Sequence, residues 1–142
     1  MQKFFWKQPL ISKRSIERIG AVMTEKKICA RAGLRLWLET DDGVLVGKGR
    51  MELLGKVDEL GSIKKAAEAM NMSYRAAWGK IKKTEGVLGE KIVDVPGGNR
   101  KGCSLTPRGR ELLASFTSWQ DRVLEYAKNT ADEFFPWMAG KI

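Results

Sequence analysis

Residues 61–81 read G-S-I-K-K-A-A-E-A-M-N-M-S-Y-R-A-A-W-G-K-I, and this stretch decides the fold. Ile63, Ala66 and Met70 are spaced i, i+3, i+7, which places them on one face of a helix. Asn71 follows where the chain must turn, because asparagine tolerates the left-handed backbone better than most residues. The pattern predicts two short helices joined by a tight turn.

Each of these two helices has a serine at its predicted start. Ser62 and Ser73 can each accept a hydrogen bond from an unpaired backbone N–H of the first turn. The small Ala67 lets a neighbouring helix approach closely, and Met72 is placed to fill the corner between the helices. The second helix carries a mostly apolar face made of Tyr74, Ala77, Trp78, Ile81, Glu85 and Leu88.

The rest of the second helix is basic. Four cations fall largely off its apolar face: Arg75, Lys80, Lys82 and Lys83. A helix-turn-helix has this form, and its second helix enters the major groove of DNA. An ordinary helical hairpin with a solvated basic side would show the same pattern, so both interpretations stay open at this point.

The charge of the chain is concentrated in one region. The 142 residues carry a formal net charge of +9, with a pI near 9.7. Residues 62–110 hold 11 Lys/Arg against 4 Asp/Glu, whereas residues 111–142 hold 3 against 5. Clustered positive charge favours a polyanionic partner, and double-stranded DNA is the partner expected here.

Composition excludes several classes of site. The chain has no histidine, so it lacks His-based metal sites and Ser-His triads. Cys29 and Cys103 form no C-x-x-C pair and are interpreted as reduced structural thiols. The glycine-rich residues 96–102 lack the G-K-[ST] of a nucleotide loop. We therefore expect no enzyme activity, no cofactor and no metal.

No membrane segment is expected, because no run of about 18 apolar residues occurs. Residues 1–27 contain 7 Lys/Arg against 2 Asp/Glu and lack the apolar core of a secretory signal. They are interpreted as a basic N-terminal arm that need not be ordered, or as an extension upstream of a natural start at Met23. The expected location is the cytoplasm.

The flanking patterns predict a winged helix-turn-helix over residues 28–106. A half-buried strand is expected over 28–39, where Leu34, Leu36 and Leu38 alternate with other residues. A turn at 41–43 leads to a return strand at 44–46. A first helix is expected from Arg50 to Leu60 and ends at Gly61 as a C-cap.

A second hairpin and a long helix follow the helix-turn-helix. Strands are expected at 91–95 and 103–105, with a basic wing loop between them that carries Arg100 and Lys101. Thr106 as N-cap and Pro107 at the first helical position start a helix that runs to about residue 135. The predicted class is α+β, mainly α.

The final helix, within residues 107–142, carries a heptad-like apolar seam of Leu112, Phe116, Trp119, Val123 and Tyr126. A small domain cannot cover so long a stripe, which favours dimerisation with a second copy of the chain. The alternative is a helix that folds back on its own core.

The strings along the chain resemble the DNA-binding domain of the ModE family of molybdate-responsive regulators, which is related to LysR-type winged helices. The resemblance rests on L-R-L-W-L-E at 34–39, G-S-I at 61–63, A-A at 66–67, M-S-Y-R-A-A-W at 72–78 and L-T-P-R-G at 105–109. It covers residues 28–126 and implies a winged helix-turn-helix transcriptional regulator. The family's C-terminal oxyanion-binding domains have no counterpart in this sequence. We therefore expect a stand-alone DNA-binding member, without molybdate sensing and with an unknown effector.

The predicted mechanism is a homodimer that reads a pseudo-palindromic site, with helix 73–88 in the major groove and the 96–102 wing on flanking DNA. Arg75 is the candidate for direct base readout, because a guanidinium can bond guanine O6 and N7 together. Trp78 is interpreted as core, whereas Tyr74 fits either core or a phosphate contact. The other predicted DNA contacts are Ser73, at the helix start, and the phosphate-binding Lys64, Lys65, Lys80, Lys82, Lys83, Arg100 and Lys101.

Two alternatives to this function remain open. The domain could bind nucleic acid without sequence preference, as an architectural or RNA-binding protein. It could also be a winged-helix module that binds protein while its basic face is merely solvated.

Overall fold

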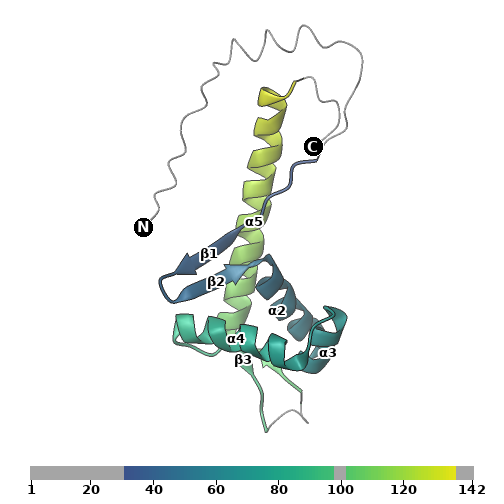
Figure 1. The fold of residues 1–142 in the computed structure, drawn as a ribbon, viewed down its shortest axis with the longest axis vertical. Helices are drawn as coiled ribbons and strands as arrows, with labels where there is room; N and C mark the ends of the chain where they lie inside the picture. The colour runs from purple at the N-terminus through teal and green to yellow at the C-terminus, as the bar shows by residue number, and fades with distance from the viewer. Residues whose placement is uncertain (1–30, 98–101, 137–142) are drawn as a thin grey trace. The chain divides into compact units, whose positions relative to one another are not determined.

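The computed structural model describes residues 31–97 and 102–136. Its elements are β1 Trp37–Thr40, β2 Gly43–Gly47, α2 Lys48–Leu60, α3 Ile63–Ala69, α4 Tyr74–Leu88, β3 Val93–Asp94, β4 Ser104–Leu105 and α5 Pro107–Phe134 (Figure 1). The predicted mainly helical α+β class and the winged helix-turn-helix order are confirmed. The predicted arm at residues 1–27 lies outside the described residues. The helix-turn-helix, both hairpins and the first part of α5 lie in one compact unit, Leu34–Arg122.

The first hairpin is shorter and more exposed than the alternating leucines predict. β1 begins only at Trp37 and pairs antiparallel with β2, with an irregularity between Leu38 and Glu39. All four β1 residues are exposed, and Leu34 lies before the strand with 42% of its surface exposed. The predicted half-buried strand over 28–39 is therefore wrong for residues 31–39, where the strand is shorter and exposed. Residues 28–30 lie outside the described residues. Burial falls on β2 instead, where Val46 enters the core.

Three helices form the centre of the core. α2 contributes Met51, Leu53, Leu54 and Val57, all at most 3% exposed. α3 adds Ile63, Ala66 and Ala67, and α4 adds Ala77 and Ile81. The small alanines allow close helix contact, as the sequence predicted. α2 starts at Lys48, two residues before the predicted start, because the extended Gly47 serves as its N-cap residue.

The corner between α3 and α4 follows the local sequence signals. Asn71 adopts a left-handed backbone with φ 53°, and Met72 packs against the core from the corner. The Met72 N–H donates to the Ala67 carbonyl at 3.0 Å, which closes the turn. Ser62 and Ser73 cap α3 and α4, their hydroxyls accepting from the N–H groups of residues 65 and 76. The predicted helix-turn-helix geometry is therefore confirmed in detail.

The second hairpin is anchored to the start of α5. β3 pairs with β4, so the predicted strands are present but shorter, at two residues each. The Thr106 hydroxyl caps α5 by accepting from the Gly109 N–H at 3.1 Å, and it donates to the Lys91 carbonyl at 2.8 Å. A Cβ on Gly109 would overlap the Ile92 carbonyl, so only glycine permits this approach of α5 to the hairpin.

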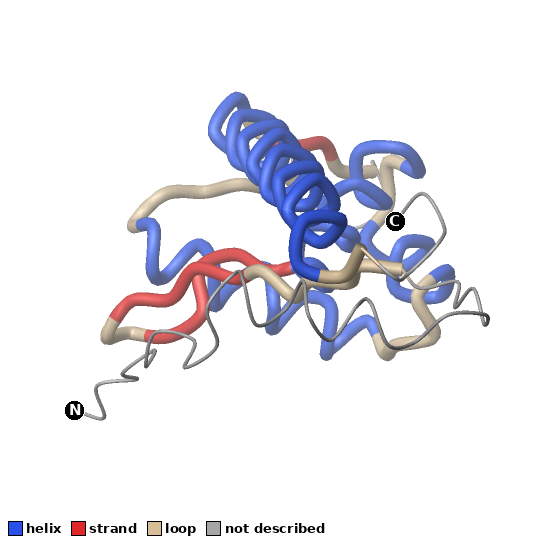
Figure 2. The backbone as a smooth tube through the Cα atoms, turned by 90° about the horizontal axis from the view of Figure 1, so that it is seen from above, coloured by secondary structure: helices blue, strands red, loops and turns tan. Residues whose placement is uncertain are grey.

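The first part of α5 packs against the first hairpin. Figure 2 shows the strands of β1 and β2 beside α5, and Leu38, Val46, Leu112 and Trp119 line an apolar hollow there of about 210 Å³. Phe116 lies 4% exposed in the core, with its ring edge-on to Trp119 at 6.0 Å. Phe116 therefore has little surface left for a second copy of the chain, and its place in the dimer seam stays a prediction.

Candidate nucleic-acid interface

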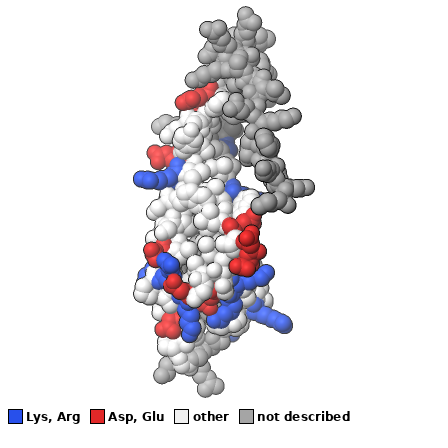
Figure 3. Space-filling model, turned by 90° about the vertical axis from the view of Figure 1, so that its left-hand side faces the viewer, with Lys and Arg blue, Asp and Glu red and all other residues white. Residues whose placement is uncertain are grey.

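The helix-turn-helix exposes a set of cations. Lys64 and Lys65 lie at the start of α3, and α4 adds Arg75, Lys80 and Lys83; all five are exposed. Figure 3 shows Lys and Arg side chains gathered in the lower half of the face in view, with some acidic residues among them. Within residues 31–97 and 102–136, none of the five takes part in a salt bridge. Their charge is available to a polyanion.

Other cations of this region are paired inside the protein. Arg108 lies 2.9 Å from Glu111 and 3.4 Å from Glu90, and these carboxylates raise the pKa of its guanidinium. Lys56 pairs with Glu59 at 2.7 Å. Partial burial lowers the pKa of Arg50, which donates to the Thr84 hydroxyl at 2.7 Å. Because these cations already have partners within the chain, they are poorer candidates for DNA contacts.

The outward side of α4 is small as well as basic. Ala76, Gly79 and Gly86 are exposed, and a Cβ on either glycine would meet no atom of the described protein within 4 Å. Glycine inside a helix costs about 1 kcal/mol relative to alanine. Packing among the described residues gives no reason for a glycine at position 79, and the close approach of another molecule would give one.

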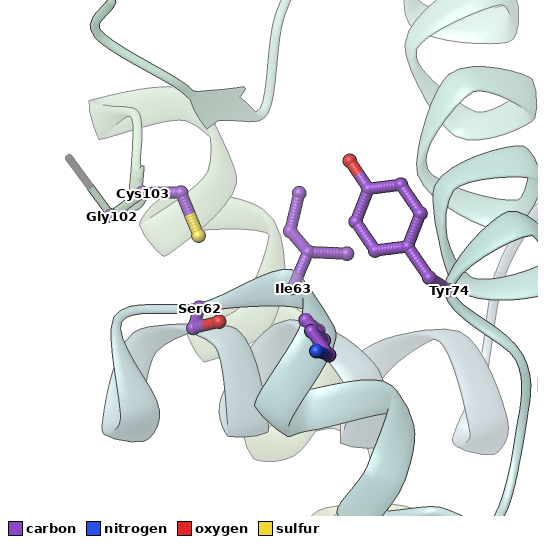
Figure 4. Close-up of a pocket in the computed structure, with 6 residues that line it drawn as sticks. Ser62, Ile63, Tyr74, Gly102 and Cys103 are labelled. Carbon is purple, nitrogen blue, oxygen red and sulfur yellow. The ribbon is translucent and has the colours of Figure 1, made fainter. Parts of the chain in front are cut away.

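The start of α4 borders a hollow of about 300 Å³. Figure 4 shows Tyr74 pointing toward Ile63, with Cys103 on the other side. Tyr74 is half-buried and stacks on Trp78, with ring centroids 6.3 Å apart and planes at 11°. Of the two roles that the sequence left open for Tyr74, packing against the core is observed, and the residue also lines the hollow. A phosphate contact stays a prediction. Trp78 packs against the core, as predicted.

Lys82 differs from its neighbours on α4. Its Nζ lies 2.7 Å from Glu85 Oε2 and 4.6 Å from the centroid of the Trp78 ring. An anion and an aromatic face both attract the ammonium group. The Lys82 ammonium group is therefore paired within its own helix although the side chain is exposed, and this pairing argues against an independent phosphate contact.

Two buried polar residues of α4 were not singled out by sequence reasoning. Thr84, 1% exposed, accepts from Arg50 and donates to the Leu45 carbonyl at 3.3 Å. Glu85, 8% exposed, accepts from the backbone N–H groups of Ile92 and Val93. Buried polar groups of this kind need partners, and here the partners lie on α2, β2 and at β3. They lock the position of α4 from two sides.

The wing is tied to the helix-turn-helix at its base. The Cys103 N–H donates to the Gly61 carbonyl at 2.9 Å, just where α2 ends in a left-handed C-cap, as predicted for Gly61. Burial raises the pKa of the Cys103 thiol, which keeps it protonated at neutral pH. The predicted wing contacts Arg100 and Lys101 lie outside the described residues.

The described residues form no other kind of site considered for this chain. No group of His, Cys, Asp or Glu among them has the arrangement of a metal site. None of the described helices is long and apolar enough to cross a membrane.

Residues 49–110 match the family model described as "Bacterial regulatory helix-turn-helix protein, lysR family". This match spans α2 through the start of α5, and so includes every exposed cation named above. The family is one of regulatory DNA-binding proteins and not of enzymes. The fold and the surface charge agree with this family.

Two curated relatives extend the match. The chain is 34% identical over 84 residues to the molybdenum transport protein ModE of Azotobacter vinelandii, which covers 58% of this chain and 31% of that protein. It is 36% identical over 76 residues to the molybdenum-pterin-binding protein MopB of Rhodobacter capsulatus, covering 52% and 28%. The chain thus spans under a third of the length of these relatives. The resemblance to the ModE family is confirmed for the DNA-binding part.

Proposed function

We propose that this chain, whose residues 49–110 match the model of a family of bacterial regulatory helix-turn-helix proteins, reads a specific DNA sequence as a homodimer. The match to this family model and the likeness to ModE support the coarser conclusion that the chain carries the DNA-binding domain of a transcriptional regulator. Sequence-specific reading is supported by the outward side of α4, which combines small residues with cations that form no salt bridge to any described residue. Such a surface can enter a groove without steric conflict.

In this proposal α4 lies in the major groove with its N-terminal end toward the bases. Arg75 is exposed in the first turn, where side chains of a recognition helix reach base edges. Bidentate bonding to guanine O6 and N7 is the commonest specific contact of arginine. Arg75 therefore recognises a base, while the neighbouring Ser73 and Tyr74 lie beside the sugar-phosphate backbone of the DNA.

The exposed lysines bind phosphates. Lys64 and Lys65 at the start of α3 contact one strand, and Lys80 and Lys83 on α4 line the groove. Such contacts fix register and supply affinity without reading the bases. The loop between β3 and β4, with Arg100 and Lys101, contacts flanking DNA.

The dimer is formed through α5. Phe116 belongs to the core of its own protomer, so the interface uses the remaining seam, above all Val123 and Tyr126. Tyr126 is 71% exposed, a large fraction for an aromatic residue. Two-fold symmetry then places the two α4 helices about one helical turn of DNA apart, 34–36 Å.

The decisive experiment selects duplexes from a randomised pool with the purified chain and sequences them. A palindromic motif whose half-sites are separated by one helical turn is expected. If duplexes were retained without a common motif, the chain would bind DNA without sequence preference, as an architectural protein does. Failure to retain any duplex at moderate salt would favour a module that binds protein.

A further inference from the structure

The carboxylate of Glu85 joins α4 to the second hairpin. Oε1 accepts from the N–H groups of Ile92 and Val93 at 3.0 and 3.3 Å, at the point where β3 begins. Oε2 lies 2.7 Å from Lys82 Nζ. A single buried side chain thus binds the hairpin with one oxygen and a cation of the recognition helix with the other.

Lys82 is restrained from two directions but stays near the surface. Glu85 lies on one side and the ring of Trp78 on the other, and 47% of the Lys82 side chain is exposed. Lys80 and Lys83, on the same helix, form no such pair within the described residues. The three lysines therefore share one helix but differ in pairing.

We propose that Glu85 is a positioning residue for DNA binding. It sets the start of the β3–β4 hairpin against α4, and it restrains Lys82, whose charge is consequently withheld from the phosphates. A phosphate that captured Lys82 would leave the Glu85 carboxylate, only 8% exposed, without its cation, which disfavours the exchange. This inference rests on the proposed DNA binding.

Glu85→Gln separates the two effects. The glutamine carbonyl can still accept from Ile92 and Val93, but its NH₂ group cannot pair with Lys82. Released Lys82 then becomes available to a phosphate. The logarithm of duplex affinity falls with the logarithm of salt concentration by about 0.9 per phosphate contact, so this slope counts the contacts directly.

The experiment measures this slope for the wild type, E85Q, K82A, E85Q/K82A and K83A on one duplex. E85Q is expected to steepen the slope by about 0.9, E85Q/K82A to remove that gain, and K83A to make the wild-type slope shallower by about 0.9. An unchanged slope in E85Q would overturn the restraint. So would a K82A slope as shallow as that of K83A.

Amide hydrogen exchange tests the positioning effect without DNA. Glu85→Ala is expected to reduce the protection of the Ile92 and Val93 amides by about tenfold or more, because it removes their acceptor, whereas E85Q retains it. Equal protection in wild type and E85A would overturn the positioning role. A wild type that binds no duplex would instead overturn the proposed function, and the exchange result would still stand.

Discussion

The helices α4 and α5 leave different chemistry on the faces that their own core does not cover. α4 buries Ala77, Ile81, Thr84 and Glu85 within 15 residues, and its outward side is basic and small. α5 buries only Gly109 and Phe116 within 28 residues, and it leaves apolar positions such as Tyr126 exposed. The two helices belong to one chain but present surfaces suited to different partners.

The distribution of charge agrees with this difference. Positive charge is concentrated in residues 62–110, whereas residues 111–142 carry more acidic than basic groups. Phosphates are attracted to the first region and not to the second. The two amphipathic helices thus differ less in their buried faces than in the chemistry of their exposed faces.

The largest effect is expected where α5 meets its own core. Phe116→Ala should lower the free energy of unfolding by about 3–5 kcal/mol, the usual cost of removing a buried phenylalanine. Urea unfolding measures this, and Ser118→Ala on the exposed side of the same helix is the control. If Phe116→Ala weakened the dimer and left the free energy of unfolding unchanged, Phe116 would belong to the dimer interface.

The second-largest effect is expected on sequence-specific DNA binding by α4. Arg75→Ala should cost about 1–3 kcal/mol of binding at one base pair of the selected site, with little change on random duplex. Titrations on the site and on its single-base variants measure the difference. Arg108→Ala, whose guanidinium is paired within the protein, serves as the control. An equal loss on all duplexes would make Arg75 a phosphate contact.

A similar or smaller effect is expected on the dissociation constant of the dimer when the exposed part of α5 is changed. Tyr126→Ala should weaken the dimer by about 2 kcal/mol, roughly thirtyfold in the dissociation constant, since tyrosines are frequent anchors of interfaces. Sedimentation equilibrium measures the shift, with Lys128→Ala as the exposed control. An unchanged equilibrium, or a monomeric wild type, would contradict the assignment of this face.

The smallest effect is expected from Gly79→Ala, which should increase stability and decrease DNA affinity. Gly79→Ala should raise the free energy of unfolding by about 0.5–1 kcal/mol, because no described atom lies within 4 Å of the added Cβ. The same variant should weaken DNA binding if the groove wall approaches α4 at this point. Gly55→Ala on α2 should show the gain in stability alone. A Gly79→Ala variant that binds as well as the wild type would exclude such close approach.

Local signals in the sequence predicted the helix-turn-helix well. Serine caps, the left-handed Asn71 and the Thr-Pro start of α5 each act within one turn of chain, so the residues themselves specify the geometry. The first hairpin was predicted less well. Alternating leucines indicate which residues share a face, but not whether another layer covers that face.

The candidate site shows the same division. The exposed cations of α4 could be predicted from helical periodicity, since Arg75, Lys80 and Lys83 fall opposite the apolar face. The pairing of Lys82 with Glu85 also had a sequence signal, an i, i+3 spacing of opposite charges. The bonds from Glu85 to Ile92 and Val93 had none, because they cross a change of chain direction.

The sequence by itself determined the order of elements, the turn of the helix-turn-helix and the concentration of positive charge. Each of these follows from the preferences of residues close together in the chain. Only the tertiary structure decided that Phe116 is core, that β1 is exposed and that Lys82 is held by a carboxylate. Those outcomes depend on which distant segments meet, and burial and pairing energies arise only when they do.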